Sequence, residues 1–251
     1  DLTDRKRLEA KVIQGEKLAA IGESVATLVH EIRNPLNGIA MNIYMLETAA
    51  NAESRWTEEE RESLHLIGRE AKRLEALVKN VLAYARNVAI QLERVVLAAF
   101  VSELSELVVH LAADRGVKLE VVLEPQDLTA RFDIDQIKQV MLNLIQNAIE
   151  AAEQSAEKVV RFCIHPAEGA PWRSVSSTGR VLLFEVENSG TPIGEESQKQ
   201  LFKPFFTTKT HGLGLGLATS AKIVRQHHGV IEIGPVSTQP FVTNFRVALP
   251  I

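Results

Sequence analysis

The stretch LVHEIRNPLNGI, residues 28–39, sets a histidine, a glutamate and an asparagine inside a run of helical periodicity. Apolar residues recur through this region at gaps of three and four, as on one face of an amphipathic helix; they are Ile21, Val25, Leu28, Ile32, Leu36, Ile39, Ile43 and Leu46. At about 100° per residue, His30 lies about 200° from both Leu28 and Ile32. The imidazole is therefore predicted to face solvent, opposite the apolar stripe.

A second amphipathic run, from Leu64 to Ala85, follows a polar stretch over residues 48–59. Thr57, with Glu60 three residues later, fits the start of this second helix. The two runs predict a hairpin of long helices, whose apolar stripes need partners because two helices cannot enclose a core. A second copy of the chain is the simplest partner and gives a dimeric four-helix bundle. We therefore expect a homodimer.

The pattern changes after Asn87, where short apolar or alternating segments are typical of β-strands. The strand-like segments span residues 117–123, 159–164, 180–188, 229–236 and 241–250, and helical runs cover residues 100–115, 136–153 and 215–228. Helices interleaved with strands predict an open α/β or α+β sandwich, with the helices on one face of a mixed sheet. The segment 165–179, rich in Gly, Pro and Ser, is expected to be a solvated hairpin loop. The chain as a whole is thus predicted to be multidomain, an all-α hairpin followed by an α/β domain.

The composition is ordinary for a globular protein, with 45% apolar residues, 24% charged residues and a formal net charge of −4. That charge gives no electrostatic reason to expect nucleic acid or an anionic membrane as a partner. A single cysteine, Cys163, excludes an internal disulfide and fits a reducing compartment. No apolar run reaches the roughly 20 residues that cross a bilayer, so we expect a cytoplasmic chain. Its abrupt start in a helical pattern suggests a piece of a longer protein, which an upstream region could attach to the membrane.

The neighbours of His30 distinguish it from an ordinary surface histidine, which is the alternative for an isolated imidazole. Glu31 can present a carboxylate to the ring and raise the basicity of its second nitrogen. Asn34 lies one turn further on, where its amide could place a water over the ring. Pro35 has no N–H, so the carbonyl of Glu31 loses its helical donor and the turn around His30 loosens. Together these residues favour the transfer of a group onto and off the histidine.

The segment HEIRNPL, which begins at His30, resembles the H-box in the HisKA dimerisation and phosphotransfer domain of two-component sensor histidine kinases. The resemblance implies that His30 accepts the γ-phosphoryl group of ATP and passes it to an aspartate in the receiver domain of a response regulator. It also implies that Glu31 acts as a general base and that Asn34 supports dephosphorylation of the regulator.

Three segments of the second half resemble nucleotide-binding boxes of the same family. NLIQNAIEA, residues 143–151, resembles the N-box, which implies that Asn143 and Asn147 line the nucleotide site and that Asn147 holds Mg²⁺ and phosphate. Without the resemblance, two amides on one helix face would be a plain hydrogen-bonded pair. HGLGLGLA, residues 211–218, resembles the G2 box, where glycines let backbone N–H groups approach phosphate at a helix N-terminus. LFKPFFTTK, residues 201–209, resembles the F-box. The contacts to nucleotide implied by these last two boxes are Phe205, Thr208, Lys209, Gly212, Leu213, Gly214, Leu215 and Gly216.

The remaining box, G1, departs from the family pattern Asp-x-Gly-x-Gly. This chain has NSGTPI, starting at Asn188, with Gly190 and Ile193 holding the register of the nucleotide-binding segment. Asn188 replaces the aspartate that reads adenine, and Pro192 replaces the second glycine. Glu187 is no substitute, because strand alternation turns it to the other face. An amide oxygen can still accept from the adenine amino group, but the lost charge assistance, worth ~1–2 kcal/mol, is expected to weaken ATP affinity roughly five- to thirtyfold.

The resemblance covers about residues 15–250 and implies a GHKL-type ATP-binding domain after the hairpin. The short stretch between Lys209 and Gly212 is similar to the lid of the nitrogen-regulator branch of the family. The domains we expect are a signalling helix after an absent PAS sensor (1–17), a dimerisation and histidine phosphotransfer domain (18–88) and a catalytic ATP-binding domain (89–251).

The leading hypothesis for function is the catalytic core of a sensor histidine kinase. It would phosphorylate itself on His30 with ATP, transfer the phosphoryl group to a response regulator, and also dephosphorylate that regulator. One alternative is a kinase-impaired phosphotransfer or phosphatase scaffold whose ATP site is weakened at Asn188 and Pro192. Another member of the same ATPase superfamily, such as a topoisomerase, is disfavoured because it leaves the histidine hairpin unexplained.

Overall fold

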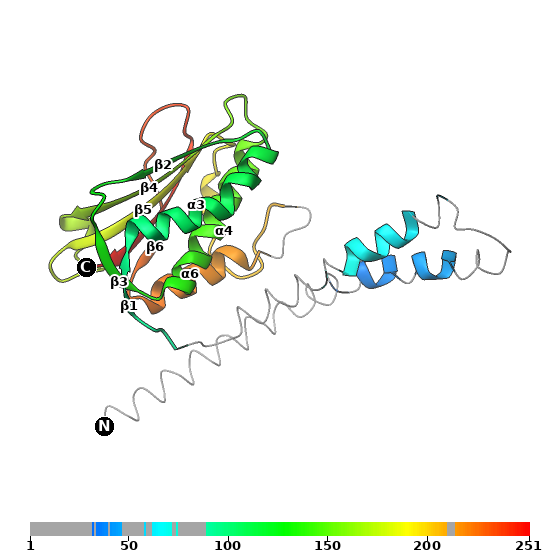
Figure 1. Ribbon diagram of the computed structural model, residues 1–251, viewed down its shortest axis with the longest axis horizontal. Coiled ribbons are helices and arrows are strands. Elements are labelled where there is room, and N and C mark those ends of the chain that lie inside the picture. Colours follow the sequence, from blue (N-terminus) through cyan, green and yellow to red (C-terminus); the bar gives the residue numbers. More distant parts are fainter. Residues whose placement is uncertain are drawn as a thin grey trace, which may run out of the picture. The chain divides into compact units, whose positions relative to one another are not determined.

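A computed structural model describes residues 32, 34–39, 41–46, 58, 62–71, 74, 89–209 and 214–251 of the chain (Figure 1). The chain divides into two compact units. The first, which we call the sheet unit, comprises residues 88–203 and 216–251, and the second, the hairpin unit, comprises residues 1–87 and 204–215. No helix in the described ranges is long and apolar enough to cross a membrane.

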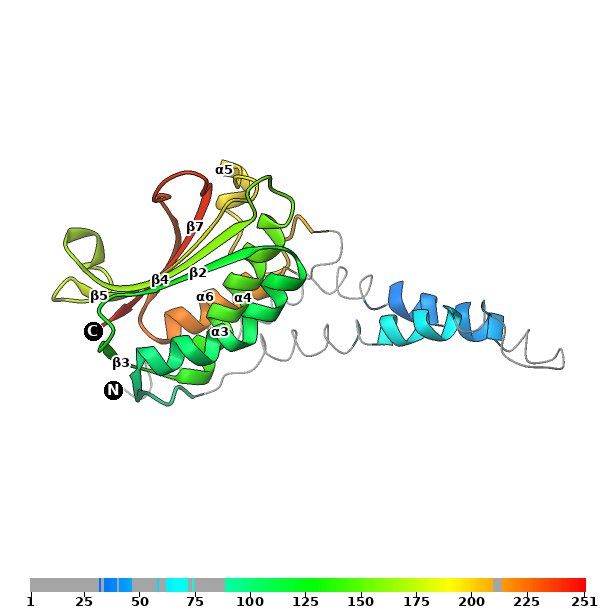
Figure 2. The same cartoon turned by 45° about the horizontal axis from the view of Figure 1, so that its top comes forward.

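The hairpin unit contains two helices that lie side by side in both views, blue and cyan in Figures 1 and 2. Within the described residues, 32, 34–39 and 41–46 belong to the first helix, and 58, 62–71 and 74 belong to the second. A Cβ placed on Gly38 would lie 3.4 Å from Cγ of Glu70, so the first helix packs closely against the second. The predicted helical hairpin is confirmed by these residues.

The sheet unit interleaves strands and helices along the chain. Its elements are β1 (Glu93–Val96), α3 (Leu97–Asp114), β2 (Lys118–Leu123), β3 (Thr129–Phe132), α4 (Ile134–Ala152), β4 (Val159–Glu168), a 3-10 helix (Ala170–Trp172), β5 (Arg180–Asn188), α5 (Glu195–Gln198), α6 (Gly216–Gln226), β6 (Val230–Gly234) and β7 (Thr243–Pro250). The three long helices and the five longer strands fall on the segments that the sequence predicts.

The main sheet has five strands, in the order β2-β4-β5-β7-β6. β2 and β4 are parallel, whereas the pairs β4–β5, β5–β7 and β6–β7 are antiparallel. β5 is therefore the central strand, and its last residue, Asn188, lies opposite Thr243 of β7. Figure 2 shows α3, α4 and α6 against one face of this sheet, which confirms the predicted arrangement of helices on one face of a mixed sheet.

The core forms between that face and the three helices, because alternate strand residues point toward them. Phe100 of α3, Phe132 of β3 and Phe184 of β5 are almost completely buried there. Their rings meet edge to face with centroids 5.5–6.3 Å apart, an arrangement that aromatic quadrupoles favour. α4 adds Ile137, Val140, Met141, Leu144, Ile145, Ala148, Ile149 and Ala152 at helical spacing. The face of α4 that carries its asparagines is thereby left outside the core.

Two parts of the sheet unit differ from the expectation. β4 continues to Glu168, and the segment after it packs the indole of Trp172, only 7% exposed, against Val181, Leu183 and Ala248. The expected hairpin is confirmed, because β4 pairs with β5 across it and most of its residues are exposed. The expectation misses the buried indole, because Gly, Pro and Ser content does not reveal the large area that one indole buries. β1 and β3, which form a separate two-stranded antiparallel sheet, are not predicted because four residues are too few to show a periodicity.

α4 starts at a buried cap. The side chain of Asp133 accepts hydrogen bonds from the N–H groups of Gln136 and Gln91, both at 3.0 Å. Burial alone would raise the pKa of Asp133, but these hydrogen bonds lower it. The N–H of Asp133 also donates to Nε2 of His227 at 3.1 Å, just after α6. The beginning of α4 is thus fixed to the end of α6.

Candidate functional site

α4 carries a row of amide side chains on the face that does not enter the core. Asn143 donates from Nδ2 to Oγ of Ser220 on α6 at 3.0 Å, and Asn147 donates from Nδ2 to Oδ1 of Asn143 at 3.4 Å. The amide oxygen of Asn147 therefore lies on the side of its amide group that is turned away from Asn143. We call Asn143, Asn147 and Ser220 the amide row. Ser220 is not predicted from the sequence, because only the packing of α6 on α4 brings it here.

The first residue of α6 touches this row. A Cβ placed on Gly216 would lie 2.5 Å from Oδ1 of Asn143, closer than real side-chain atoms approach. Any other residue at position 216 would push the Asn143 amide aside and, through their hydrogen bond, disturb Asn147. Gly216 therefore positions the amide row, whereas its contact with phosphate stays a prediction.

The G1 segment starts at the end of β5. Asn188 is 2% exposed and, two residues after buried Val186, is on the helix-facing side of the sheet. Its Oδ1 accepts a hydrogen bond from the N–H of Gly190 at 2.9 Å. The Asn188 Oδ1, which is the oxygen expected to accept from adenine, thus already accepts one hydrogen bond. The NH₂ group of the side chain is turned away from Gly190. Ile193 packs against the core, and Pro192 is exposed.

In the hairpin unit, Phe205 of the segment that resembles the F-box lies against Gly214 of the G2 box. The N–H of Phe205 donates to the carbonyl of Gly214 at 3.0 Å, and both residues have left-handed φ angles, 65° and 64°. A Cβ on Gly214 would clash with the carbonyl of Phe206, so only glycine fits. Of the other residues expected to contact nucleotide here, Thr208 and Lys209 are exposed and Leu215 is buried, while Gly212 and Leu213 lie outside the described residues.

Among the residues expected to carry the phosphoryl chemistry, Asn34 lies on the first helix. Asn34 is exposed there, beside the buried Pro35. His30 and Glu31 lie outside the described residues, so the exposure of the imidazole and the role of the carboxylate stay predictions.

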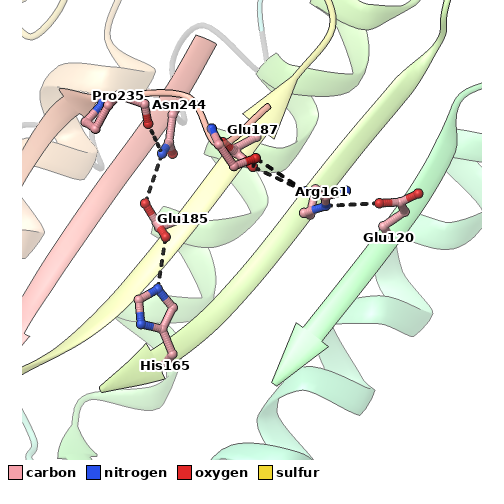
Figure 3. Close-up of polar contacts among 8 residues, drawn as sticks. Glu120, Arg161, His165, Glu185, Glu187, Pro235 and Asn244 are labelled. Atoms are coloured by element: carbon pink, nitrogen blue, oxygen red, sulfur yellow. Dashed lines mark hydrogen bonds and ion pairs between the residues drawn. The ribbon is translucent and has the colours of Figure 1, made fainter. Parts of the chain in front are cut away.

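The face of the main sheet away from the helices carries a charged network (Figure 3). The carboxylate of Glu187 accepts hydrogen bonds from the N–H and the Oγ of Ser237, at 2.6 and 2.8 Å. Nε of Arg161 donates to Glu120 at 3.0 Å, and the Arg161 guanidinium lies 3.9 Å from Glu187. Glu187 is thus held on the face opposite Asn188, as strand alternation predicts, and cannot take the place of the missing aspartate.

A second part of this network centres on Glu185. Its carboxylate oxygens lie 2.9 Å from Nε2 of His165, 2.9 Å from Nε of Arg246 and 2.9 Å from Nδ2 of Asn244. Burial alone would raise the pKa of Glu185, but the hydrogen bonds from His165 and Asn244 and the charge of Arg246 lower it to about 2. The hydrogen bond to Glu185 in turn raises the pKa of His165.

This pair should make the free energy of unfolding depend on pH. Because the pKa of His165 is raised by folding, its contribution is complete below the unfolded value near 6.5 and is lost as the pH rises through the folded value. The Glu185 contribution is complete above about 4.5 and is lost as the pH falls toward 2. We expect urea denaturation to show a loss of less than ~1 kcal/mol between pH 6 and pH 9, since His165 is partly exposed.

His165→Gln should flatten this decline between pH 6 and pH 9. The matched control is His110→Gln, on the exposed side of α3, which should leave the decline unchanged. An equal decline in the wild type and in His165→Gln would show that the pair does not contribute.

Thr243 is a further polar residue on the helix-facing side of the sheet, and the sequence does not single it out. It is 3% exposed and lies directly opposite Asn188 in the β5–β7 pairing. Its buried Oγ1 has no hydrogen-bond partner among the described residues. Because 54 residues separate the two positions in the chain (243 against 188), only the strand register brings them together.

Two family models match the chain. Residues 20–89 match the His Kinase A (phospho-acceptor) domain, and residues 132–251 match the histidine kinase-, DNA gyrase B- and HSP90-like ATPase family. The first match contains the H-box segment, and the second contains the amide row, Asn188 and Thr243. The two matches lie in the order that the motifs predict.

Relatives and solved structures agree with these matches. The chain is 31% identical over its full length to the signal transduction histidine-protein kinase AtoS of Escherichia coli (strain K12), covering 38% of that protein. It is 33% identical over 91% of its length to the sensor histidine kinase ZraS of Klebsiella oxytoca, covering 46% of it. It therefore spans less than half the length of these two relatives.

A solved histidine kinase, ThkA, crystallised in complex with the response regulator protein TrrA, superposes on the chain with a TM-score of 0.74. The two are 27% identical, and the match covers 97% of this chain and 65% of ThkA. The chain matches a phospho-acceptor domain followed by an ATPase domain, and it resembles histidine kinases along its whole length. These findings show that this chain belongs to the two-component sensor histidine kinases.

Proposed function

We propose that this chain is a catalytic core that phosphorylates itself on His30 with ATP and passes the phosphoryl group to an aspartate of a response regulator. One observation carries the proposal: a phospho-acceptor match around His30 is followed by an ATPase match that contains the amide row. The likeness to ThkA, which crystallised with a response regulator, supports a receiver domain as the partner. The domain limits we propose are 1–17, 18–88 and 89–251, for the signalling helix, the phosphotransfer domain and the catalytic domain.

The proposed reaction has two displacements at phosphorus. In the first, a ring nitrogen of His30 attacks the γ-phosphorus, the bond to the bridging oxygen breaks and ADP leaves, while the proton on the other ring nitrogen passes to Glu31. In the second, a carboxylate oxygen of the regulator attacks, the phosphorus–nitrogen bond breaks and Glu31 returns the proton to the ring, which frees His30 as a neutral imidazole. Asn34, which is exposed on the first helix, would orient water for hydrolysis of the regulator's aspartyl phosphate.

The amide row fits a magnesium ion shared with nucleotide phosphates. Mg²⁺ takes oxygen ligands and usually keeps waters and phosphate oxygens, so one amide oxygen from the protein, that of Asn147, suits it. Within the described ranges, no group of three or more His, Cys, Asp or Glu side chains could hold a metal ion. When bound, Mg²⁺ supplies charge neutralisation at the leaving diphosphate.

We also propose that the chain is a homodimer. In the single chain, Leu36 and Ile43 of the predicted apolar stripe are 50% and 43% exposed, and Leu64 of the second helix is 44% exposed. A second hairpin packed against these side chains would bury them in a four-helix bundle.

A kinase-impaired scaffold is a second candidate function, favoured by one observation. The side-chain Oδ1 of Asn188 already accepts from the N–H of Gly190, so an adenine amino group on the other side of the amide would meet the NH₂ of Asn188. Such a protein would still exchange phosphoryl groups with a regulator through His30.

Incubation with millimolar γ-labelled ATP and Mg²⁺ tests the proposed function. The wild type should acquire label that is labile in acid and stable in alkali, as a phosphohistidine is, and His30→Ala should acquire none. His65→Ala is the matched control, because His65 is an exposed histidine on the second helix, and it should label like the wild type.

Label that persists in His30→Ala would contradict the assignment of the phospho-acceptor. No label in the wild type, together with label in Asn188→Asp, would favour the scaffold.

A further inference from the structure

The side chain of Asn188 has a fixed orientation at the end of β5. Its Oδ1 accepts from the N–H of Gly190 at 2.9 Å, and turning the amide over would set its NH₂ against that N–H, donor against donor. Gly190 packs closely against α4, since a Cβ built on it would lie 2.7 Å from backbone atoms of Ala151, so it has little room to shift toward the helix. The group that the Asn188 amide directs away from Gly190 is therefore its NH₂, which is a donor.

A second polar group lies beside this donor. Thr243 is opposite Asn188 in the antiparallel β5–β7 pair, and directly opposite side chains stand on the same face with Cβ atoms roughly 4.5–5.5 Å apart. The Thr243 hydroxyl is buried with no hydrogen-bond partner among the described residues. A buried hydroxyl without a partner is costly unless a ligand or a water completes it. A hydroxyl can donate or accept a hydrogen bond, whereas the Asn188 NH₂ can only donate. Asn188 therefore decides which ligand groups the two side chains together can bind.

The family's carboxylate is not supplied from elsewhere on β5. Glu187 and Glu185 point to the other face of the sheet, where Ser237, His165, Asn244 and Arg246 hold them. The part of the site expected to hold the base therefore has no charged side chain from β5. It presents the NH₂ of Asn188 as a donor, and beside it the hydroxyl of Thr243, which can donate or accept.

We propose that Asn188 and Thr243 make this site select a 6-oxopurine nucleotide over ATP. The proposal rests on the proposed function, since it takes the base to lie at Asn188. The O6 atom of a 6-oxopurine would accept from the Asn188 NH₂, and its N1–H would donate to the Thr243 hydroxyl, directly or through a water. The 6-amino group of adenine would instead face the NH₂ of Asn188, and one such mismatch is worth about tenfold or more in affinity.

Calorimetric titration of the whole chain with Mg²⁺ and ITP, GTP or ATP tests this preference. The wild type should bind ITP about tenfold tighter than ATP. Asn188→Asp, which turns the donor into an acceptor, should reverse the order. Thr243→Val keeps the shape and removes the hydroxyl, so it should weaken ITP and ATP alike without reversing the preference. Titration with GTP distinguishes the two 6-oxopurines. If GTP binds as tightly as ITP, the site accepts guanine; if GTP does not bind, the site is limited to hypoxanthine.

Wild-type protein that binds ATP as tightly as ITP, or more tightly, overturns the inference and leaves the proposed function standing if His30 still becomes labelled. Absence of binding by all three nucleotides overturns both. The wild-type ratio of ITP to ATP affinity decides the matter alone if either variant fails to fold, which a circular dichroism melt would show.

Discussion

Replacing Asn147 by alanine should lower the rate of autophosphorylation at least about a hundredfold at saturating nucleotide. The change removes the amide oxygen that we assign to Mg²⁺, and the loss of one well-placed electrostatic group commonly costs two to three orders of magnitude in rate. It also removes the hydrogen bond to Asn143, which loosens the amide row. Labelling of His30 over time, with Mg²⁺ varied, measures both the rate and the metal requirement.

The matched control is Gln146→Ala, one residue away on the same helix and exposed. It should stay within about twofold of the wild type, since Gln146 lies outside the amide row. Asn147→Asp keeps an oxygen ligand but loses the donor to Asn143, so its rate should fall between those of the wild type and Asn147→Ala. If Asn147→Ala needed no more Mg²⁺ and labelled as fast as the wild type, the assignment of the metal ligand would be wrong.

Replacing Ile43 by glutamate should convert the dimer to a monomer. Ile43 is 43% exposed in the single chain and belongs to the apolar stripe of the first helix. In a symmetric dimer one substitution places two carboxylates in the interface, and each buried charge without a partner costs several kcal/mol. Light scattering coupled to size exclusion should give a mass near 27.7 kDa for the variant and twice that for the wild type.

Asn37→Glu is the matched control for the dimer, because it adds the same charge at an exposed polar position of the same helix. That variant should remain dimeric. A wild-type chain that is monomeric at micromolar concentration, or an Ile43→Glu variant that is dimeric, would refute the proposed four-helix bundle.

The periodicity of apolar residues predicts much of the fold of this chain. α4 and α6 have apolar stripes at gaps of three and four and are predicted to within one turn at each end. β4, β5 and β7 have long apolar or alternating segments that strands require. β1 and β3 could not be predicted, because their pairing depends on the core around Phe100 and Phe132 and not on their own four-residue sequences.

The residues of the candidate site also fall into those that the sequence predicts and those that it does not. Spacing and family resemblance point to Asn143, Asn147 and Asn188. Neither could show that Asn188 directs its oxygen to Gly190, because that depends on how closely the loop packs on α4. Thr243 and Ser220 belong to the surroundings of the site only through tertiary structure, one by strand register and the other by helix packing.

The position of β7 in the main sheet has a consequence for how the protein is made. β7 follows the other described strands in the sequence, yet it lies between β5 and β6 and pairs directly with the central strand. Until residues 243–250 have emerged from the ribosome, β5 can pair with β4 on one side only and its other edge stays unpaired, and such edges invite aggregation. The sheet unit can close only after Thr243–Pro250 has emerged, whereas the contacts within the helical hairpin are closer in sequence and can form earlier.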